Sequence, residues 1–516
     1  MRHAHAIFWY LLSRLSVALS ALLLLPLALS QQDVVTGAVA RVTGASGTWM
    51  TGKAMAVAGA GASAGLSTYG VPLLVAVATG ALFRHLGREH KRPLTLAEGA
   101  LFAVMAWPYL AFVGAMPFVL SGQLSPLDAF FESMSSFTAT GLSNFDYVAG
   151  ALPPSLVLWH GLMNWLGGLA FVVMLVTVLP QVSGCFGITL TARQSVYFSP
   201  VWRKMHQSIW QGLAVYGGLT VIFLGVFLAL GLTPLRALLL SLTTISTAGS
   251  GAASAFSMGS LGRDSALEAA GCCMMLVTGG NFLLYWKCIA RRSPRLLWAD
   301  AELRATLAVA AACSLLVALH LAFTGTYPIL TALRHGAFHV ISFFTTAGFS
   351  SVAVSAWPDF DRYVLFLLAF VGGCIGSPAG GLKVVRLLVL AKLTVEELRR
   401  TLHPHMVVSV RLDGLAVPDK VVGRILAFFF LTNAFFFLGT IAIAASGVAI
   451  LPAMGLSAGC LTSTGQVALL LGLEGLAALA PATKIVAILL MLAGRAGIFS
   501  LLMLGAIGGE SAQKKW

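Results

Sequence analysis

The chain consists mainly of long apolar stretches separated by short polar ones. Each long stretch has enough apolar residues to cross about 30 Å of hydrocarbon as a helix. We therefore predict an all-α integral membrane protein with ten transmembrane helices, at residues 6–30, 65–86, 97–121, 156–180, 207–231, 265–290, 303–325, 361–394, 421–448 and 483–507.

The composition supports this class. Of the 516 residues 58% are hydrophobic and only 10% are charged, which is far from the composition of a water-soluble domain. The first apolar stretch has an alternative interpretation as a cleaved signal peptide, since Arg2 and Arg14 flank its beginning. Its length of about 25 residues exceeds the usual apolar region of a signal peptide, which favours a retained helix.

The basic residues lie unevenly on the two sides of the predicted helices. If the N-terminus is cytoplasmic, the loops at 84–92, 193–204, 287–304 and 383–424 share one side and hold twenty Lys and Arg residues, against seven on the other side. Positive residues mark the cytoplasmic side of short loops. The net charge of +14 thus reflects membrane orientation, with lipid as the neighbouring partner, and we expect no nucleic acid.

An internal repeat runs through most of the chain. Four segments have Ser or Thr three residues before a Gly, and the two residues between them are small. We call them the S/T-x-x-G segments. They are Thr138, Ala139, Thr140, Gly141; Ser246, Thr247, Ala248, Gly249; Thr345, Thr346, Ala347, Gly348; and Thr462, Ser463, Thr464, Gly465.

A proline precedes each segment, at Pro126, Pro234, Pro328 and Pro452, and proline is well tolerated at the start of a helix. The residues between proline and segment are too few to cross a membrane. Each repeat therefore predicts a helix, a re-entrant half-helix with an extended segment, and a second helix. We expect an N-terminal two-helix region at 1–90 and pore repeats at 91–192, 193–298, 299–412 and 413–516.

Four re-entrant segments can surround one axis. Non-helical backbone at membrane depth is tolerated where it is buried in protein or lines a water-filled path. Carbonyl groups of such segments can replace the hydration shell of a cation. The sequence thus predicts a pore in which the sixteen residues of the S/T-x-x-G segments hold the ion.

The chain resembles the Trk/Ktr/HKT superfamily of potassium transporters, and within it the TrkH type. Besides the four segments, the motifs that carry the resemblance are Leu158-Trp159-His160 with Trp165-Leu166-Gly167-Gly168, Gly279-Gly280-Asn281-Phe282, Asp300-Ala301-Glu302-Leu303-Arg304, Gly372-Gly373-Cys374-Ile375-Gly376-Ser377 with Gly380-Gly381-Leu382-Lys383, and Gly494-Arg495. Departures are Pro378 and Ala379, where the family usually has Thr and Gly, and Gly497, where an acidic residue is frequent.

The resemblance implies a potassium-conducting membrane subunit in the bacterial inner membrane, with K⁺ as the transported ion and no organic cofactor. It also implies a homodimer with one pore in each protomer and a cytosolic ring of TrkA-type nucleotide-binding subunits. The chain has no GxxxxGK[ST] phosphate loop, so nucleotide control would come from such a partner. We expect no enzymatic activity.

The resemblance places a gate below the S/T-x-x-G segments. Arg495 is predicted to form an electrostatic barrier, with a structural tie to carbonyl groups as the alternative. The glycine-rich stretch is predicted to form a mobile loop, with a helix kink as the alternative. The expected gate residues are Gly372, Gly373, Gly376, Gly380, Gly381, Lys383 and Arg495.

Several questions remain open at this stage. Glu132 is predicted either to concentrate cations or to bind nearby backbone, and Lys383 either to face the cavity or to extend to the membrane surface. Passive conduction competes with a Na⁺- or H⁺-coupled carrier, with a less selective K⁺/Na⁺ pathway and with a membrane scaffold. The repeats offer Ser, Thr and Gly rather than ionisable relays, which disfavours coupling.

Overall fold

The structure is a computed structural model that describes residues 6–43, 65–88, 96–145, 152–177, 201–249, 265–403, 410–412 and 415–513. Helices make up nearly all of this part of the chain. The exception is a short antiparallel pair, β1 (Arg411–Leu412) and β2 (Leu415–Ala416), with Arg411 opposite Ala416. The predicted all-α class is confirmed. Several polar loops used above to infer orientation, including 89–92 and 193–200, lie outside the described residues.

The helices alternate between long and short ones in the order that the repeats predict. Their bounds are α1 (Ala6–Thr43), η1 (Leu66–Gly70), α4 (Val71–Leu86), α5 (Leu96–Leu120), α6 (Pro126–Phe137), α7 (Pro154–Thr177), α10 (Val201–Ala229), α11 (Pro234–Ser246), α12 (Ser265–Thr278), α13 (Phe282–Arg291), α14 (Arg295–Ala299), α15 (Ala301–Phe323), α16 (Ile329–Phe344), η4 (Val354–Ala356), α17 (Asp359–Val371), α18 (Val384–Leu402), α19 (Asp419–Ala445), α20 (Ile450–Thr462), α21 (Gln466–Leu470), η5 (Leu476–Ala478), α22 (Pro481–Ala496) and α23 (Ile498–Gln513).

The membrane crossings are mostly, but not all, straight helices. Among the described residues, seven helices are long and apolar enough to cross a membrane, or nine crossings if each of two bent pairs counts as one. The predicted crossing at 265–290 is bent by 90° between α12 and α13, and the one at 483–507 by 106° between α22 and α23. Asn281 causes the first bend, because its side chain accepts from the Leu283 and Leu284 N–H groups and starts α13 anew.

The predicted crossing at 361–394 is divided. Its first part is α17 and its second part is α18, and the non-helical stretch Gly372–Lys383 separates them. Gly372, Gly376, Gly381 and Lys383 all have positive φ, which ends helical geometry at this place. The interruption of the crossing that the sequence predicts is thus present between α17 and α18.

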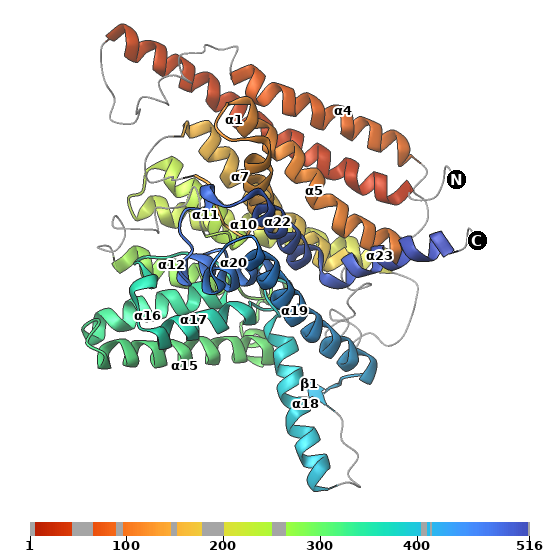
Figure 1. Cartoon of the computed structure of the whole chain (residues 1–516), viewed down its shortest axis with the longest axis vertical. Coiled ribbons are helices and arrows are strands. Elements are labelled where there is room, and N and C mark those ends of the chain that lie inside the picture. The colour runs from red at the N-terminus through yellow and green to blue at the C-terminus, as the bar shows by residue number, and fades with distance from the viewer. Residues whose placement is uncertain are drawn as a thin grey trace.

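The two N-terminal helices pack on the side of the repeats. Helix α1 contacts α4, α5 and α7, and its Leu12, Leu19 and Leu23 belong to the main apolar core. Figure 1 shows α1, α4 and α5 together at one end of the molecule, and α18 projecting from the other end beside β1. Longer helices thus surround the four short helices α6, α11, α16 and α20. This arrangement buries the S/T-x-x-G segments.

Candidate functional site

Each S/T-x-x-G segment follows one of four short helices. Helix α6 has 12 residues, α11 and α20 have 13, and α16 has 16, so none approaches the ~20 residues of a crossing. Proline is the first residue of α6 and α11 and the N-cap of α16, and Pro452 lies in the first turn of α20. These positions lack an intrahelical N–H partner anyway, so proline starts the helix at little cost.

The four segments share one unusual backbone conformation. The second residue of each is left-handed, with φ of 52° at Ala139, 55° at Thr247, 56° at Thr346 and 56° at Ser463. These are four of only six non-glycine residues with positive φ in the described chain. A left-handed non-glycine residue costs about 1–2 kcal/mol. The same strained turn in all four repeats gives structural support to the repeat inferred from sequence.

The first hydroxyl of each segment has a fixed task. Thr138, Ser246, Thr345 and Thr462 each donate to the carbonyl four residues earlier, at distances of 2.7, 2.9, 2.7 and 2.9 Å. The Met134 and Ile341 carbonyls also accept the backbone N–H of Thr138 and Thr345, both at 2.9 Å, so there the hydroxyl adds a second bond at the helix end. Ser or Thr at this position thus satisfies its own buried hydroxyl in all four segments.

The segments meet in two backbone-bonded pairs. The Gly465 N–H donates to the Thr140 carbonyl at 2.6 Å, and the Gly249 N–H donates to the Ala347 carbonyl at 2.5 Å. The first repeat is thus joined to the fourth, and the second to the third. Segments from distant parts of the chain therefore meet in a buried region. Every Ser and Thr side chain of the four segments is at most 3% exposed.

Glu132 binds backbone and hydroxyl groups that follow the first segment. Its carboxylate accepts from the Ser143 hydroxyl at 2.6 Å and from the Asn144 N–H at 2.7 Å. His160 Nε2 lies 3.1 Å from the same carboxylate. Of the two interpretations left open by the sequence, binding of nearby backbone is the one that the geometry supports.

The loop Gly372–Lys383 lies directly against the segments. The Gly380 N–H donates to the Thr346 hydroxyl at 2.8 Å, and a Cβ added at Gly380 would overlap the Thr462 carbonyl oxygen. On its other side the Ile375 N–H donates to the Glu302 carboxylate at 2.7 Å, and the Cys374 N–H to the Gly279 carbonyl at 2.7 Å. The loop is therefore bonded both to the segments and to the helices behind it.

Two basic side chains are buried beside this loop. Arg495 is 1% exposed, donates from Nη1 to the Pro378 carbonyl at 2.7 Å and stacks 4.0 Å from the Phe171 ring centre. Lys383 is 5% exposed, lies 5.7 Å from the same ring centre and binds the Ala379 carbonyl. Lys383 thus points inward and does not extend to the membrane surface.

Arg495 is only partly satisfied. Its Nε and Nη2 have no hydrogen-bond partner within the part of the chain that the structure describes. The Pro378 carbonyl is the partner that the sequence left undetermined, and Gly497, with φ of 84°, ends α22 immediately after it. A buried guanidinium with free donors costs free energy, so its presence in an apolar helix indicates a functional role.

The sequence missed two residues, one that contacts the backbone after the third segment and one that contacts the two buried basic side chains. His339 accepts at Nε2 from the Ser351 N–H, and Phe171 holds both basic side chains, yet neither carries a local motif. His339 had a detectable signal, because it precedes Gly348 by the same nine residues that separate Glu132 from Gly141. Phe171 had no such signal, since its ring meets Lys383 and Arg495 only through the packing of three helices that are distant in the sequence.

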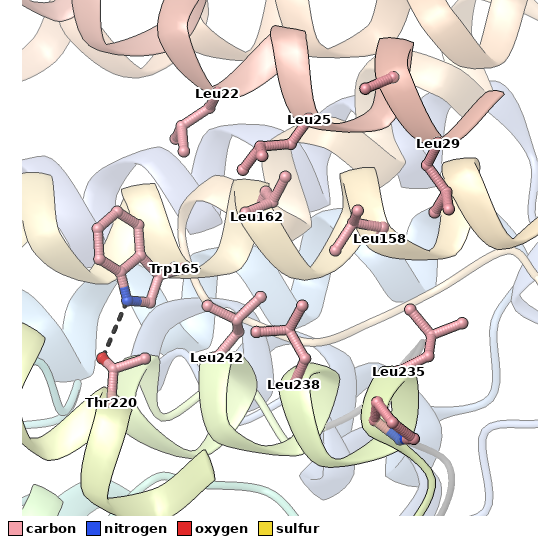
Figure 2. A pocket seen from close by; sticks show the side chains of 12 residues that line it. Leu22, Leu25, Leu29, Leu158, Leu162, Trp165, Thr220, Leu235, Leu238 and Leu242 are labelled. Atoms are coloured by element: carbon pink, nitrogen blue, oxygen red, sulfur yellow. Dashed lines mark hydrogen bonds between the residues drawn. The ribbon is translucent and has the colours of Figure 1, made fainter. Parts of the chain in front are cut away.

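A cavity of about 600 Å³ lies elsewhere, between α1, α7, α10 and α11. Figure 2 shows leucines of α1, α7 and α11 pointing into it, with the Trp165 N–H donating to the Thr220 hydroxyl at its edge. Such a lining offers almost no oxygen to replace the hydration of a cation. This cavity is therefore not suited to ion passage.

Metal sites built from ionisable side chains are also missing from the described residues, where no three His, Cys, Asp or Glu side chains gather in a metal-binding group. The S/T-x-x-G segments instead gather backbone and hydroxyl oxygens, which are ligands for hard, weakly bound cations.

Comparison with known proteins agrees with this chemistry. The model of the TrkH family, described as cation transport proteins, matches residues 71–515. The chain belongs to the TrkH family. It is therefore a multi-pass membrane transport protein and not an enzyme.

Individual TrkH proteins are similar over most of their length. The Trk system potassium uptake protein TrkH of Halomonas elongata is 32% identical over 73% of this chain and 79% of its own. That of Salmonella typhimurium is 31% identical over 83% and 89%. The crystal structure of the potassium transporter TrkH from Vibrio parahaemolyticus superimposes with a TM-score of 0.75, at 27% identity, over 94% of this chain and 98% of that one.

Proposed function

We propose that this chain is the potassium-translocating membrane subunit of a Trk-type uptake system and that K⁺ passes through the ring of S/T-x-x-G segments. One observation carries the proposal. Four segments with the same left-handed turn are joined backbone to backbone in two buried pairs, the first with the fourth and the second with the third. The names of the similar proteins, which are potassium uptake proteins, give the ion.

Backbone oxygens of the sixteen segment residues are the ligands in this proposal. A cation at hydrocarbon depth needs oxygens in place of its hydration shell. The C-terminal ends of α6, α11, α16 and α20 point toward these segments, and each helix end adds a partial negative charge of about −0.5. The site therefore favours a cation over an anion.

The loop and the two basic residues form the proposed gate. The loop is bonded to Thr346 and lies against Thr462, and Arg495 and Lys383 place positive charge beside it. Gly372, Gly373, Gly376, Gly380 and Gly381 supply the backbone freedom that a moving loop needs. In the conformation described here the loop and the charges oppose the passage of a cation.

The wider setting follows the family. We propose the four pore repeats at the boundaries inferred from sequence, a retained first helix, a cytoplasmic N-terminus in a bacterial inner membrane, a homodimer and a TrkA-type nucleotide-binding ring. The projecting end of α18 carries Arg399 and Arg400 in its last turn, paired with Glu396 and Glu397, and provides an exposed surface of mixed charge for a cytosolic partner.

Flux through purified protein in liposomes tests the function. At a clamped membrane potential we expect uptake of K⁺ and Rb⁺ to exceed that of Na⁺ and Li⁺. Uptake that follows an imposed proton or sodium gradient at zero potential would identify a coupled carrier instead. Equal uptake of all four ions would contradict the proposed selectivity.

Substitution of Arg495 tests the gate. Two unit charges 4 Å apart at an effective dielectric of 20 interact by about 4 kcal/mol, so Arg495→Ala is expected to raise K⁺ flux at least about tenfold. Arg495→Lys keeps the charge and should remain close to the parent. A lower melting temperature with unchanged unitary conductance in Arg495→Ala would show that the residue only holds structure.

A further inference from the structure

Two of the four segments are followed by backbone that buried side chains hold in place. In the first repeat Glu132 accepts from the Ser143 hydroxyl and the Asn144 N–H, at 2.6 and 2.7 Å. In the third repeat His339 Nε2 lies 3.3 Å from both the Ser350 hydroxyl and the Ser351 N–H. Glu132 and His339 are both fully buried.

These two side chains stand at the same position of their repeats. Each precedes its segment glycine by nine residues, and the residues that its polar atoms contact follow that glycine by two and three residues. His339 Nδ1 lies 2.8 Å from the His335 carbonyl, which can only accept. The ring proton is therefore on Nδ1, and Nε2 is an acceptor like the Glu132 carboxylate.

A second contact repeats in the same two places. The Ser135 hydroxyl donates to the Leu142 carbonyl at 2.6 Å, and the Ser342 hydroxyl donates to the Phe349 carbonyl at 2.7 Å. Both serines precede their glycine by six residues, and both carbonyls follow it directly. Three bonds thus fix the backbone beyond Gly141. Two fix it beyond Gly348, because the Ser350 hydroxyl donates its proton to the Val352 carbonyl at 2.6 Å and only lies against His339 Nε2.

The second and fourth repeats lack these side chains. Leu240 and Leu456 occupy the position of Glu132 and His339, and both are fully buried. In the fourth repeat the chain continues as α21 directly after Gly465, and the residues after Gly249 lie outside the described chain. The second and fourth segments instead donate, through Gly249 and Gly465, to carbonyls of the third and first.

We propose that Glu132 and His339 are positioning residues that set the width of the ion-binding ring, and hence its preference for K⁺ over the smaller Na⁺. This rests on the proposed function. The braced first and third segments supply the Thr140 and Ala347 carbonyls on which the other two segments are bonded. Movement of a braced segment therefore displaces its neighbour as well, and the two side chains control all four sides of the ring.

The test compares K⁺ and Na⁺ uptake by liposomes that contain the full chain. Glu132→Leu and His339→Leu install the residue found in the other repeats, and each is expected to lower the ratio of K⁺ to Na⁺ uptake about tenfold, the effect of losing hydrogen bonds to a buried acceptor. Glu132→Gln and His339→Gln keep one acceptor oxygen and should give intermediate ratios. Leu456→Met is the matched control, and it should keep the ratio of the parent.

The outcomes separate the proposal from a structural role and from the proposed function itself. Folded Leu variants that lose total flux but keep the parental K⁺ to Na⁺ ratio would overturn the positioning role. If the Leu variants do not fold, Ser143→Ala removes the hydroxyl that donates to Glu132, and a parental ratio in this variant and in His339→Gln would overturn the positioning role equally. A parent chain that itself shows no preference for K⁺ would instead refute the proposed function.

Discussion

The first and third repeats differ from the second and fourth in the reason why each needs its glycine. Gly141 and Gly348 have φ of 78° and 68°, a conformation that glycine adopts freely. Gly465 has φ of −57°, yet a Cβ there would lie 2.7 Å from the Thr140 carbonyl oxygen. A Cβ at Gly249 would overlap the Ala347 carbonyl oxygen. One sequence motif thus serves two structural needs.

This difference also shows how a fourfold sequence repeat gives a twofold structure. The four segments share their first hydroxyl bond and their left-handed second residue. They differ in the backbone conformation of their glycine. They also differ in whether their backbone donates or accepts the hydrogen bond that joins two repeats. The shared features end the short helices, and the alternating ones join neighbouring segments.

The largest expected effect comes from adding a methyl group where backbone approaches closely. Gly249→Ala would place its Cβ 2.6 Å from the Gly348 carbonyl carbon, which cannot move without displacing the third segment. Overpacking costs about 1–3 kcal/mol, and a contact with backbone on both sides places this variant at the upper end. Gly348→Ala, with its nearest atom 3.9 Å away, pays only the left-handed backbone cost of about 1–2 kcal/mol.

Thermal unfolding in detergent and K⁺ flux measure both variants. We expect Gly249→Ala to lose more of each than Gly348→Ala. Equal losses would mean that the two pairs of repeats do not differ in their glycine requirement.

A hydroxymethyl group on the first glycine should change ion preference. Gly141→Ser adds a side chain to a residue whose φ is 78°, so the backbone must shift and one quarter of the ring changes shape. We expect Na⁺ uptake to rise relative to K⁺ in a competition flux assay, by roughly tenfold. A well-folded variant with unchanged preference would remove Gly141 from the ion path.

The loop is expected to depend on the third repeat rather than on the second. Thr346→Val removes the acceptor of the Gly380 N–H and leaves that buried donor unpaired, at a cost of about 1–3 kcal/mol. This favours displacement of the loop, so single-channel open probability should rise about fivefold or more. Thr247→Val is the control, because among the described residues the Thr247 hydroxyl donates to the neighbouring Ser246 carbonyl and has no bond to the loop. A similar rise in both variants would contradict a specific loop contact.

The smallest effect concerns the conformation that all four segments share. Ala139→Gly relieves a left-handed alanine at φ of 52°, and part of the gain is offset by the larger entropy of glycine in the unfolded chain. The melting temperature should rise slightly, corresponding to about 0.5–1 kcal/mol. Ser463→Gly should do the same, since this feature does not distinguish the pairs of repeats.

The elements that sequence predicted well are those set by nearby residues. Pro126 and Pro234 begin their helices, and the glycine-rich stretch from Gly372 interrupts a crossing, because backbone restrictions act within a few residues. The apolar crossings followed from length and composition alone. The bend at Asn281 was missed, since the flanking residues on both sides are apolar enough to continue one helix.

The remaining features depend on which repeats lie side by side. The orientation of Lys383 follows from the Ala379 carbonyl and the Phe171 ring, and no periodicity in the sequence encodes that meeting. The tasks of Glu132 and His339 depend on backbone geometry that only the folded segments create. Comparison of equal positions between repeats, rather than a search for motifs, would have found the second of these residues.

The bond between Gly465 and Thr140 has a consequence for biosynthesis. It joins the last repeat to the first, so it forms only after almost the whole chain has left the ribosome and entered the membrane. Until then the Thr140 carbonyl lacks this donor, and an unpaired carbonyl at hydrocarbon depth is costly. The bond between the first and fourth segments is thus a late step of assembly, and a chain truncated before the fourth repeat cannot form it.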